Sequence, residues 1–112
     1  MPQYLLLMYH PAEGPPKDDW ADQQKQWTDY HQGLVADGVL VSNTGLQGPE
    51  AATTVRVRGG ETQVTDGPFA ETKEHLAGYF LVDVKDLDAA LAYAAQMPAS
   101  AYGSIEVRPA WG

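Results

Sequence analysis

The feature that most constrains the fold is an unbroken apolar run at residues 4–9, which ends at His10 and Pro11. The run is too short for a typical helix, and it lacks the alternation of a strand with one wet face. Such runs are typical of a central strand that is buried on both faces. A second largely apolar segment follows at residues 77–84. The sequence therefore predicts a sheet with two central strands, both of whose faces are covered.

A helix is expected to run to about residue 37, with Asp18 or Asp19 as its N-terminal cap. An apolar stripe at helical spacing should pack on the sheet. It consists of Trp20, Trp27, His31 and Leu34, with Tyr30 and Val35 at its flanks. His31 is therefore predicted to point inward. Gly38 is placed to end the helix in a left-handed conformation.

Alternation of valine with polar residues over positions 53–66 predicts a β-hairpin that turns at Gly59 and Gly60. A two-residue turn sets the register: Val55 opposite Val64, Val57 opposite Thr62, Arg56 opposite Gln63 and Arg58 opposite Glu61. We expect an ion pair in the last of these pairs. Asp66 should emerge near Thr53, where the hairpin ends.

Further strands are expected at residues 39–46 and 104–109, and Asp86 should cap a second helix that Pro98 ends. The order is strand, helix, strand, hairpin, strand, helix, strand. This order predicts an α+β, ferredoxin-like βαββαβ fold with an inserted hairpin, in which two helices cover one face of an antiparallel sheet. Residues 1–112 suffice for a single domain. Because the strands are apolar on both faces, we predict a homodimer packed sheet to sheet.

The composition excludes several classes of function. The formal net charge is -8, with 7 Lys+Arg against 15 Asp+Glu, so the chain lacks the basic footprint that nucleic acids require. It has no cysteine, which excludes disulfides and thiolate metal sites. Neither a signal peptide nor an apolar run of membrane-spanning length is found, and we expect a cytoplasmic protein with no membrane partner.

The densest cluster of unusual residues is Asp66-Gly67-Pro68-Phe69 with Lys73 close behind. Gly before Pro predicts a turn, and an aspartate in that position commonly bonds its own backbone. As a catalytic base, Asp66 would need partial burial, for which Phe69 can supply an apolar wall. The alternative for Phe69 is an ordinary core residue. Glu71, Lys73 and Glu74 can bind a polar substrate or form a solvated charged loop. The solvated loop is favoured for Glu74, whereas Lys73 can hold a substrate carboxylate.

The whole chain resembles the YCII-related family, and specifically its DGPF subgroup. The resemblance is carried by residues 4–9, 36–41, 45–47, 54–57, 78–84 and 105–109, and above all by Val-Thr-Asp-Gly-Pro-Phe-Ala-Glu-Thr-Lys-Glu at residues 64–74. It implies a dimeric α/β-barrel of ferredoxin-like subunits with a small-molecule pocket. It also implies a His–Asp acid–base pair of the kind proposed for some members. His31 lies on the corresponding helix, where Trp27 is the other candidate for the matching position. Because some members of the subgroup are linked with extracytoplasmic-function sigma factors, the resemblance also implies a regulatory role as an alternative.

These observations leave three hypotheses open. The first is an enzyme of lyase-like or isomerase-like proton transfer, in which Asp66 and His31 are catalytic and no organic cofactor or metal is needed. Its substrate would be held by four further residues: Tyr9, His10, Phe69 and Lys73. The second is a regulatory module that binds a ligand or a protein without catalysis. The third is a dimeric domain whose motif only shapes the fold. His75 is expected to face solvent or the dimer partner.

Overall fold

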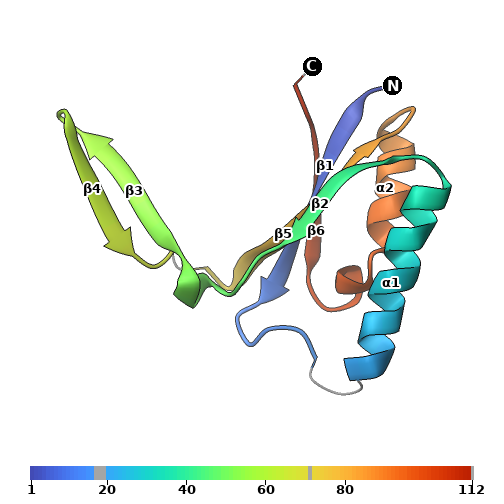
Figure 1. Cartoon of the computed structure of the whole chain (residues 1–112), viewed down its shortest axis with the longest axis horizontal. Helices are drawn as coiled ribbons and strands as arrows, with labels where there is room; N and C mark the ends of the chain where they lie inside the picture. The colour runs from blue at the N-terminus through green and yellow to red at the C-terminus, as the bar shows by residue number, and fades with distance from the viewer. Residues whose placement is uncertain (17–19, 71, 112) are drawn as a thin grey trace.

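Four strands form one antiparallel sheet in the order β2-β5-β1-β6, with both helices on the same side of it (Figure 1). The structure is a computed structural model that describes residues 1–16, 20–70 and 72–111. The strands of the sheet are β1 (Gln3–Pro11), β2 (Leu40–Gly45), β5 (Glu74–Asp83) and β6 (Ser104–Pro109). The helices are α1 (Trp20–Ala36) and α2 (Leu87–Gln96). Two short 3-10 turns also occur, η1 (Pro49–Ala51) between β2 and the hairpin and η2 (Pro98–Ala101) between α2 and β6. This is the predicted ferredoxin-like βαββαβ arrangement, and the two apolar runs are its central strands.

The hydrophobic core lies between the helices and one face of the sheet. Leu6 of β1, Val82 of β5 and Leu34 of α1 are almost completely buried there. The predicted inward stripe of α1 is only partly right, because Trp20 is 68% exposed whereas the flanking Tyr30 is buried. Trp20 is the first residue of α1, while Tyr30 lies a few turns further on, where its ring makes an edge contact with Phe80 of β5.

Local signals set the ends of the helices as predicted. Gly38 follows α1 with φ 71°, and the Val39 amide donates to the Leu34 carbonyl. The Asp86 carboxylate accepts a hydrogen bond from the Ala89 amide at 2.9 Å and caps α2. The predicted caps of α1, Asp18 and Asp19, lie outside the described residues.

The inserted hairpin projects away from the body of the molecule (Figure 1), and we call it the arm. It consists of β3 (Thr53–Arg58) and β4 (Glu61–Asp66), and it has the predicted register, including Thr53 opposite Asp66. Both turn glycines have positive φ, as a two-residue hairpin turn requires. The predicted Arg58–Glu61 ion pair was wrong: among the described residues the Arg58 guanidinium donates instead to the Val57 carbonyl at 3.1 Å.

The sheet face opposite the helices is uncovered in the single chain. Side chains alternate between the two faces of a strand, so Leu5 and Leu7 of β1 lie opposite to Leu6. Their cross-strand neighbours Leu81 and Tyr79 lie on the same face, and all of them are half-buried. No helix in the described ranges is long and apolar enough to cross a membrane.

Candidate functional site

The largest hollow described here lies between the start of α1, the end of β1 and the loop after η2, and we call it the α1 cavity. Its volume is about 610 Å³. The aromatic side chains in its wall are His10, Trp20, Trp27 and Tyr102. The rest of the wall consists of Met8, Pro15, Gln23, Gln24, Thr28, Gly45 and Ala77. The cavity therefore combines aromatic rings, neutral amides and one histidine.

The backbone around Gly103 explains why Tyr102 lies against His10. A Cβ added at Gly103 would lie 2.1 Å from the Tyr9 carbonyl oxygen, so only glycine allows the loop to approach β1 this closely. The Gly103 amide also donates to the Ala99 carbonyl at 2.8 Å, which closes the turn. The Tyr102 ring consequently lies with its centroid 5.5 Å from that of His10.

His10 is a titratable group in the wall of the α1 cavity. Its Nε2 is screened from solvent and has no hydrogen-bond partner among the described residues. Burial lowers the pKa of His10, because the imidazolium form is poorly solvated there. Burial raises the pKa of the Tyr102 hydroxyl for the corresponding reason. At neutral pH the cavity therefore holds a neutral imidazole beside a protonated phenol.

His31 lies in the wall of an adjoining hollow of about 230 Å³, on the side of α1 that faces the sheet. This agrees with the inward orientation predicted from the sequence. The hollow shares Trp27 with the α1 cavity and adds Asn43 and Phe80. The Trp27 and Phe80 rings are stacked, with their planes 4° apart and their centroids 6.2 Å apart. Trp27 is thereby fixed between the two hollows.

A second neighbouring hollow, of about 400 Å³, separates the end of β1 from the segment that leads into the arm. His10 and His75 both line it, because they are paired across β1 and β5. His75 is half-buried in the wall of this hollow. From the sequence it was expected to face solvent or the dimer partner. Glu74 also differs from expectation: it begins β5, and its carboxylate accepts a hydrogen bond from the Ser104 hydroxyl at 2.8 Å.

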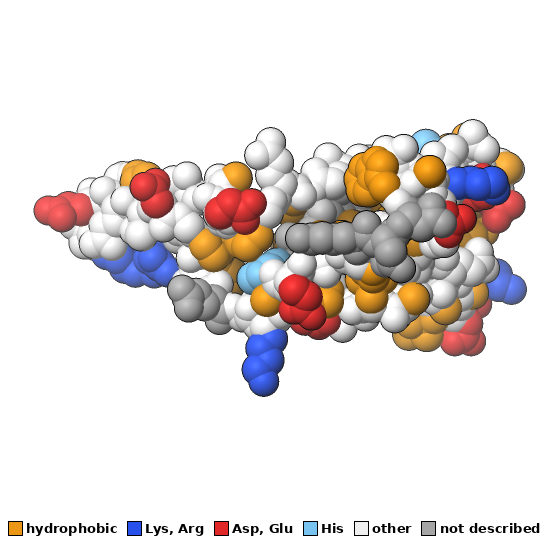
Figure 2. Space-filling model, turned by 90° about the horizontal axis from the view of Figure 1, so that it is seen from below, with side chains coloured by type: hydrophobic (Ala, Val, Ile, Leu, Met, Phe, Trp, Pro, Cys, Tyr) orange, Lys and Arg blue, Asp and Glu red, His pale blue; other side chains and the backbone are white. Residues whose placement is uncertain are grey.

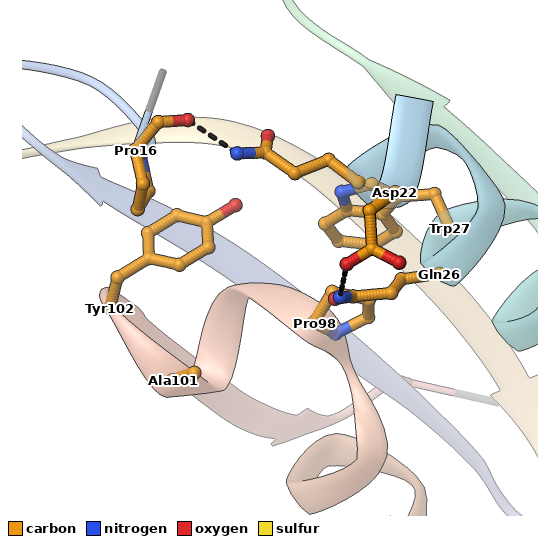
Figure 3. A pocket seen from close by; sticks show the side chains of 8 residues that line it. Pro16, Asp22, Gln26, Trp27, Pro98, Ala101 and Tyr102 are labelled. Atoms are coloured by element: carbon orange, nitrogen blue, oxygen red, sulfur yellow. Dashed lines mark hydrogen bonds between the residues drawn. The ribbon is translucent and has the colours of Figure 1, made fainter. Parts of the chain in front are cut away.

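Figure 3 shows a third neighbouring hollow, of about 330 Å³, in which the Tyr102 hydroxyl points inward from the loop after η2. Trp27, Asp22 and Gln26 face it from α1, and Pro16 closes one side. The Gln26 amide donates to the Asp22 carboxylate at 2.8 Å. This hollow therefore shares its aromatic wall with the α1 cavity and adds a carboxylate.

The arm positions the residues of the Asp-Gly-Pro-Phe motif away from these walls. Asp66 is exposed at the end of β4, and it is not among the residues that line the four hollows above. Gly67 has φ 98°, its amide donates to the Ala52 carbonyl at 2.7 Å, and its carbonyl accepts a hydrogen bond from the Thr54 hydroxyl at 2.7 Å, so the turn is fixed to the arm through its backbone groups. Phe69 is 79% exposed, so its interpretation as a core residue of this chain was wrong. Lys73 is also exposed, and Glu71 lies outside the described residues.

Tyr9 and His10, both predicted to bind substrate, lie on opposite faces of the sheet. The Tyr9 hydroxyl donates to the Glu106 carboxylate at 3.1 Å on the uncovered face. Glu106 also pairs with Arg108, and these two hydrogen bonds lower the pKa of Glu106. Tyr9 therefore belongs to the uncovered face and not to the α1 cavity.

Sequence reasoning missed Tyr102, which contributes to the walls of three adjoining hollows. The available signal was Tyr102-Gly103, a bulky ring beside a glycine in a turn that follows a proline-terminated helix. No group of three or more His, Asp or Glu side chains in the described part of the chain is arranged to hold a metal ion.

Comparison with known proteins gives two findings. Residues 2–111 match the YCII-related domain family. The sequence is also 52% identical over 61 residues to the uncharacterized protein R00369 of Rhizobium meliloti (strain 1021). That alignment covers 53% of this chain and 49% of the relative, so the matched segment spans about half of the relative's length.

Proposed function

The chain belongs to the YCII-related domain family, and we propose that it binds a small molecule in the α1 cavity and transfers a proton there through His10. The observation that carries the proposal is the His10 imidazole, whose Nε2 lacks a hydrogen-bond partner among the described residues at the wall of a 610 Å³ cavity. Such a nitrogen is costly to bury, and a ligand that donates a hydrogen bond would compensate for it.

The chemistry that suits this arrangement is lyase-like or isomerase-like proton transfer. A neutral imidazole can take a proton from the substrate and later return it, with no change in oxidation state. The protonated Tyr102 hydroxyl is the nearby donor for a substrate oxygen that becomes negative. His31 faces the adjoining hollow and would contact a substrate that extends past Trp27.

Asp66, the base favoured by the sequence motif, could take part in this mechanism only from a second copy of the chain. It lies on the arm of its own chain, so a second copy of the chain would have to bring its carboxylate to the α1 cavity. We therefore propose His10 as the proton-transfer group of each chain, with Asp66 a catalytic residue only if the arm crosses between subunits.

The same family membership and the uncovered sheet face support a homodimer. Leu5, Leu7, Tyr79 and Leu81 form an apolar patch that a second copy would bury. Light scattering on a size-exclusion column should give twice the chain mass at micromolar concentration. Leu81→Glu should shift the protein to a monomer, because it introduces a charge into the centre of the patch. A monomeric wild-type protein would contradict the proposed dimer.

A thermal-shift screen against a metabolite library tests the ligand-binding function. A ligand at a hundred times its Kd stabilises the folded protein by about 2.7 kcal/mol. We expect hits that stabilise the wild type and Asp66→Asn equally but stabilise His10→Gln less. Hits whose stabilising effect is lost in Asp66→Asn but kept in His10→Gln would place the site on the arm and overturn the proposal.

The alternative function is a non-catalytic regulatory module that binds a ligand or a protein, and the arm favours it. Val55, Val57 and Val64 share one face of the hairpin and are 58–65% exposed. A Val55→Thr, Val57→Thr double variant removes much of this apolar face and leaves the α1 cavity untouched. A regulatory role of the arm predicts loss of function in this variant with ligand binding unchanged.

A further inference from the structure

The α1 cavity and the hollows that adjoin it at Tyr102 are walled by aromatic rings and by carboxylates, with no Lys or Arg among their described lining residues. We infer that the ligand of the α1 cavity is a small organic cation, such as a protonated or methylated amine. This inference rests on the proposed small-molecule function and adds the chemical class of the ligand.

The aromatic groups are the first part of the argument. Trp20 and Trp27 of α1 converge on one cavity with Tyr102, which follows η2. Trp20 keeps 68% of its surface exposed although it begins a helix whose later residues are buried in the core. The face of an aromatic ring attracts a cation, most strongly for Trp. Rings around a space of this size suit a compact ammonium group.

The charges near the cavity are the second part. Asp22 lines the hollow that shares Trp27 and Tyr102 with the α1 cavity, and Glu13 lines another that shares Tyr102. Lys25 lies on the same helix as Asp22, but its ammonium pairs with Asp29 at 2.8 Å. Figure 2 shows the described Lys and Arg side chains of the lower face on the arm and at the margins.

An anionic ligand fits these walls poorly. A carboxylate or phosphate that loses its water needs a positive partner to offset that loss. No Lys or Arg lines the described walls, and the nearest histidine is held neutral by burial. A protonated amine, in contrast, donates hydrogen bonds that the neutral imidazole of His10 can accept. The net charge of -8 adds long-range attraction for cations.

Three probes of nearly equal size and shape test the inference by isothermal titration calorimetry at constant ionic strength. They are choline, its uncharged isostere 3,3-dimethylbutan-1-ol, and the anion 3,3-dimethylbutanoate. Cation–π attraction of about 0.5–2 kcal/mol predicts that choline binds roughly two- to thirtyfold more tightly than the alcohol. The anion should bind most weakly. Equal affinities for choline and the alcohol would overturn the inference while leaving the small-molecule function intact, and so would preferential binding of the anion.

Matched tryptophan variants locate the effect. Trp20→Leu keeps an apolar side chain but removes a ring, so it should lower the affinity for choline several-fold and change that for the alcohol little. Trp111 is fully exposed near the C-terminus and lines none of the hollows described, so Trp111→Leu is the control and should change neither affinity. Two results would contradict the assignment of the cation to the α1 cavity. One is that Trp20→Leu does not weaken choline binding, and the other is that Trp111→Leu weakens it as much as Trp20→Leu does.

Discussion

The arm and the α1 cavity differ in how far a local sequence motif indicates a binding site. The arm ends in the most distinctive motif of the chain, yet Asp66 and Phe69 are exposed and Gly67 simply forms a turn. The wall of the α1 cavity comes from residues that are far apart in the sequence and have no motif around them, such as His10 and Tyr102. A dense local motif can thus reflect backbone geometry, whereas a cavity wall is assembled by tertiary packing.

The largest difference between the two regions should appear in core substitutions. Leu34→Ala removes a side chain that is 1% exposed, and it should lower the free energy of unfolding by about 2–5 kcal/mol. Val57→Ala in the arm, where the side chain is 58% exposed, should change it by less than about 0.5 kcal/mol. Urea denaturation monitored by circular dichroism measures both. A large effect of Val57→Ala would show that the arm is covered in solution.

Substitutions of Gly103 and Gly67 should separate the α1 cavity from the arm. In Gly103→Ala the new Cβ would lie 2.1 Å from the Tyr9 carbonyl, so the loop that carries Tyr102 must move, at a cost of about 1–3 kcal/mol. In Gly67→Ala no atom lies within 4 Å of the new Cβ, and the cost is the positive φ alone, about 1–2 kcal/mol. Only Gly103→Ala should also weaken ligand binding. Weaker ligand binding in Gly67→Ala would link the arm to the cavity.

The neutral state of His10 predicts a pH dependence of stability. Burial lowers the pKa of His10 in the folded state below the value of about 6.5 in the unfolded chain. The unfolded state therefore binds the proton first as the pH falls below 6.5, and the folded state loses stability. Urea midpoints at pH 7.5 and 5.5 should differ more for the wild type than for His10→Gln, which cannot titrate. An equal difference between the two urea midpoints in the wild type and in His10→Gln would show that His10 is not held neutral.

The smallest effect is expected at the tip of the arm. Because the described structure contains no ion pair between Arg58 and Glu61, a double-mutant cycle to alanine at these two positions should show no measurable coupling. The measurement is the free energy of unfolding of the two single variants and the double variant. A clear favourable coupling would restore the ion pair that the hairpin register suggested.

Much of the fold was predictable because its signals are local. Gly59 and Gly60 fix the turn and hence every pair of the hairpin, and Gly38 and Asp86 mark helix ends through backbone geometry. The exposure of Trp20 and the burial of Tyr30 were not predictable from helical spacing alone. Both depend on where α1 lies relative to the end of the sheet, which is a tertiary property.

The candidate site was predictable only in part. The position of His10 at the end of a buried strand correctly indicated a pocket wall, and the helical stripe correctly directed His31 inward. Tyr102 could not be placed, because its contact with His10 depends on the close approach of Gly103 to β1. Phe69 was misassigned because a bulky residue after a turn suggests burial, while the projection of the arm leaves it in solvent.

The most direct test of the central claim is a map of amide and indole chemical-shift changes on titration with 3,3-dimethylbutan-1-ol. The alcohol is uncharged, so the test is independent of the charge of the ligand. If the ligand binds in the α1 cavity, the largest changes are expected at His10, Trp27 and Tyr102, with small changes throughout β3 and β4. Changes concentrated at Asp66 and Phe69, with His10 and Tyr102 unaffected, would contradict binding in the α1 cavity.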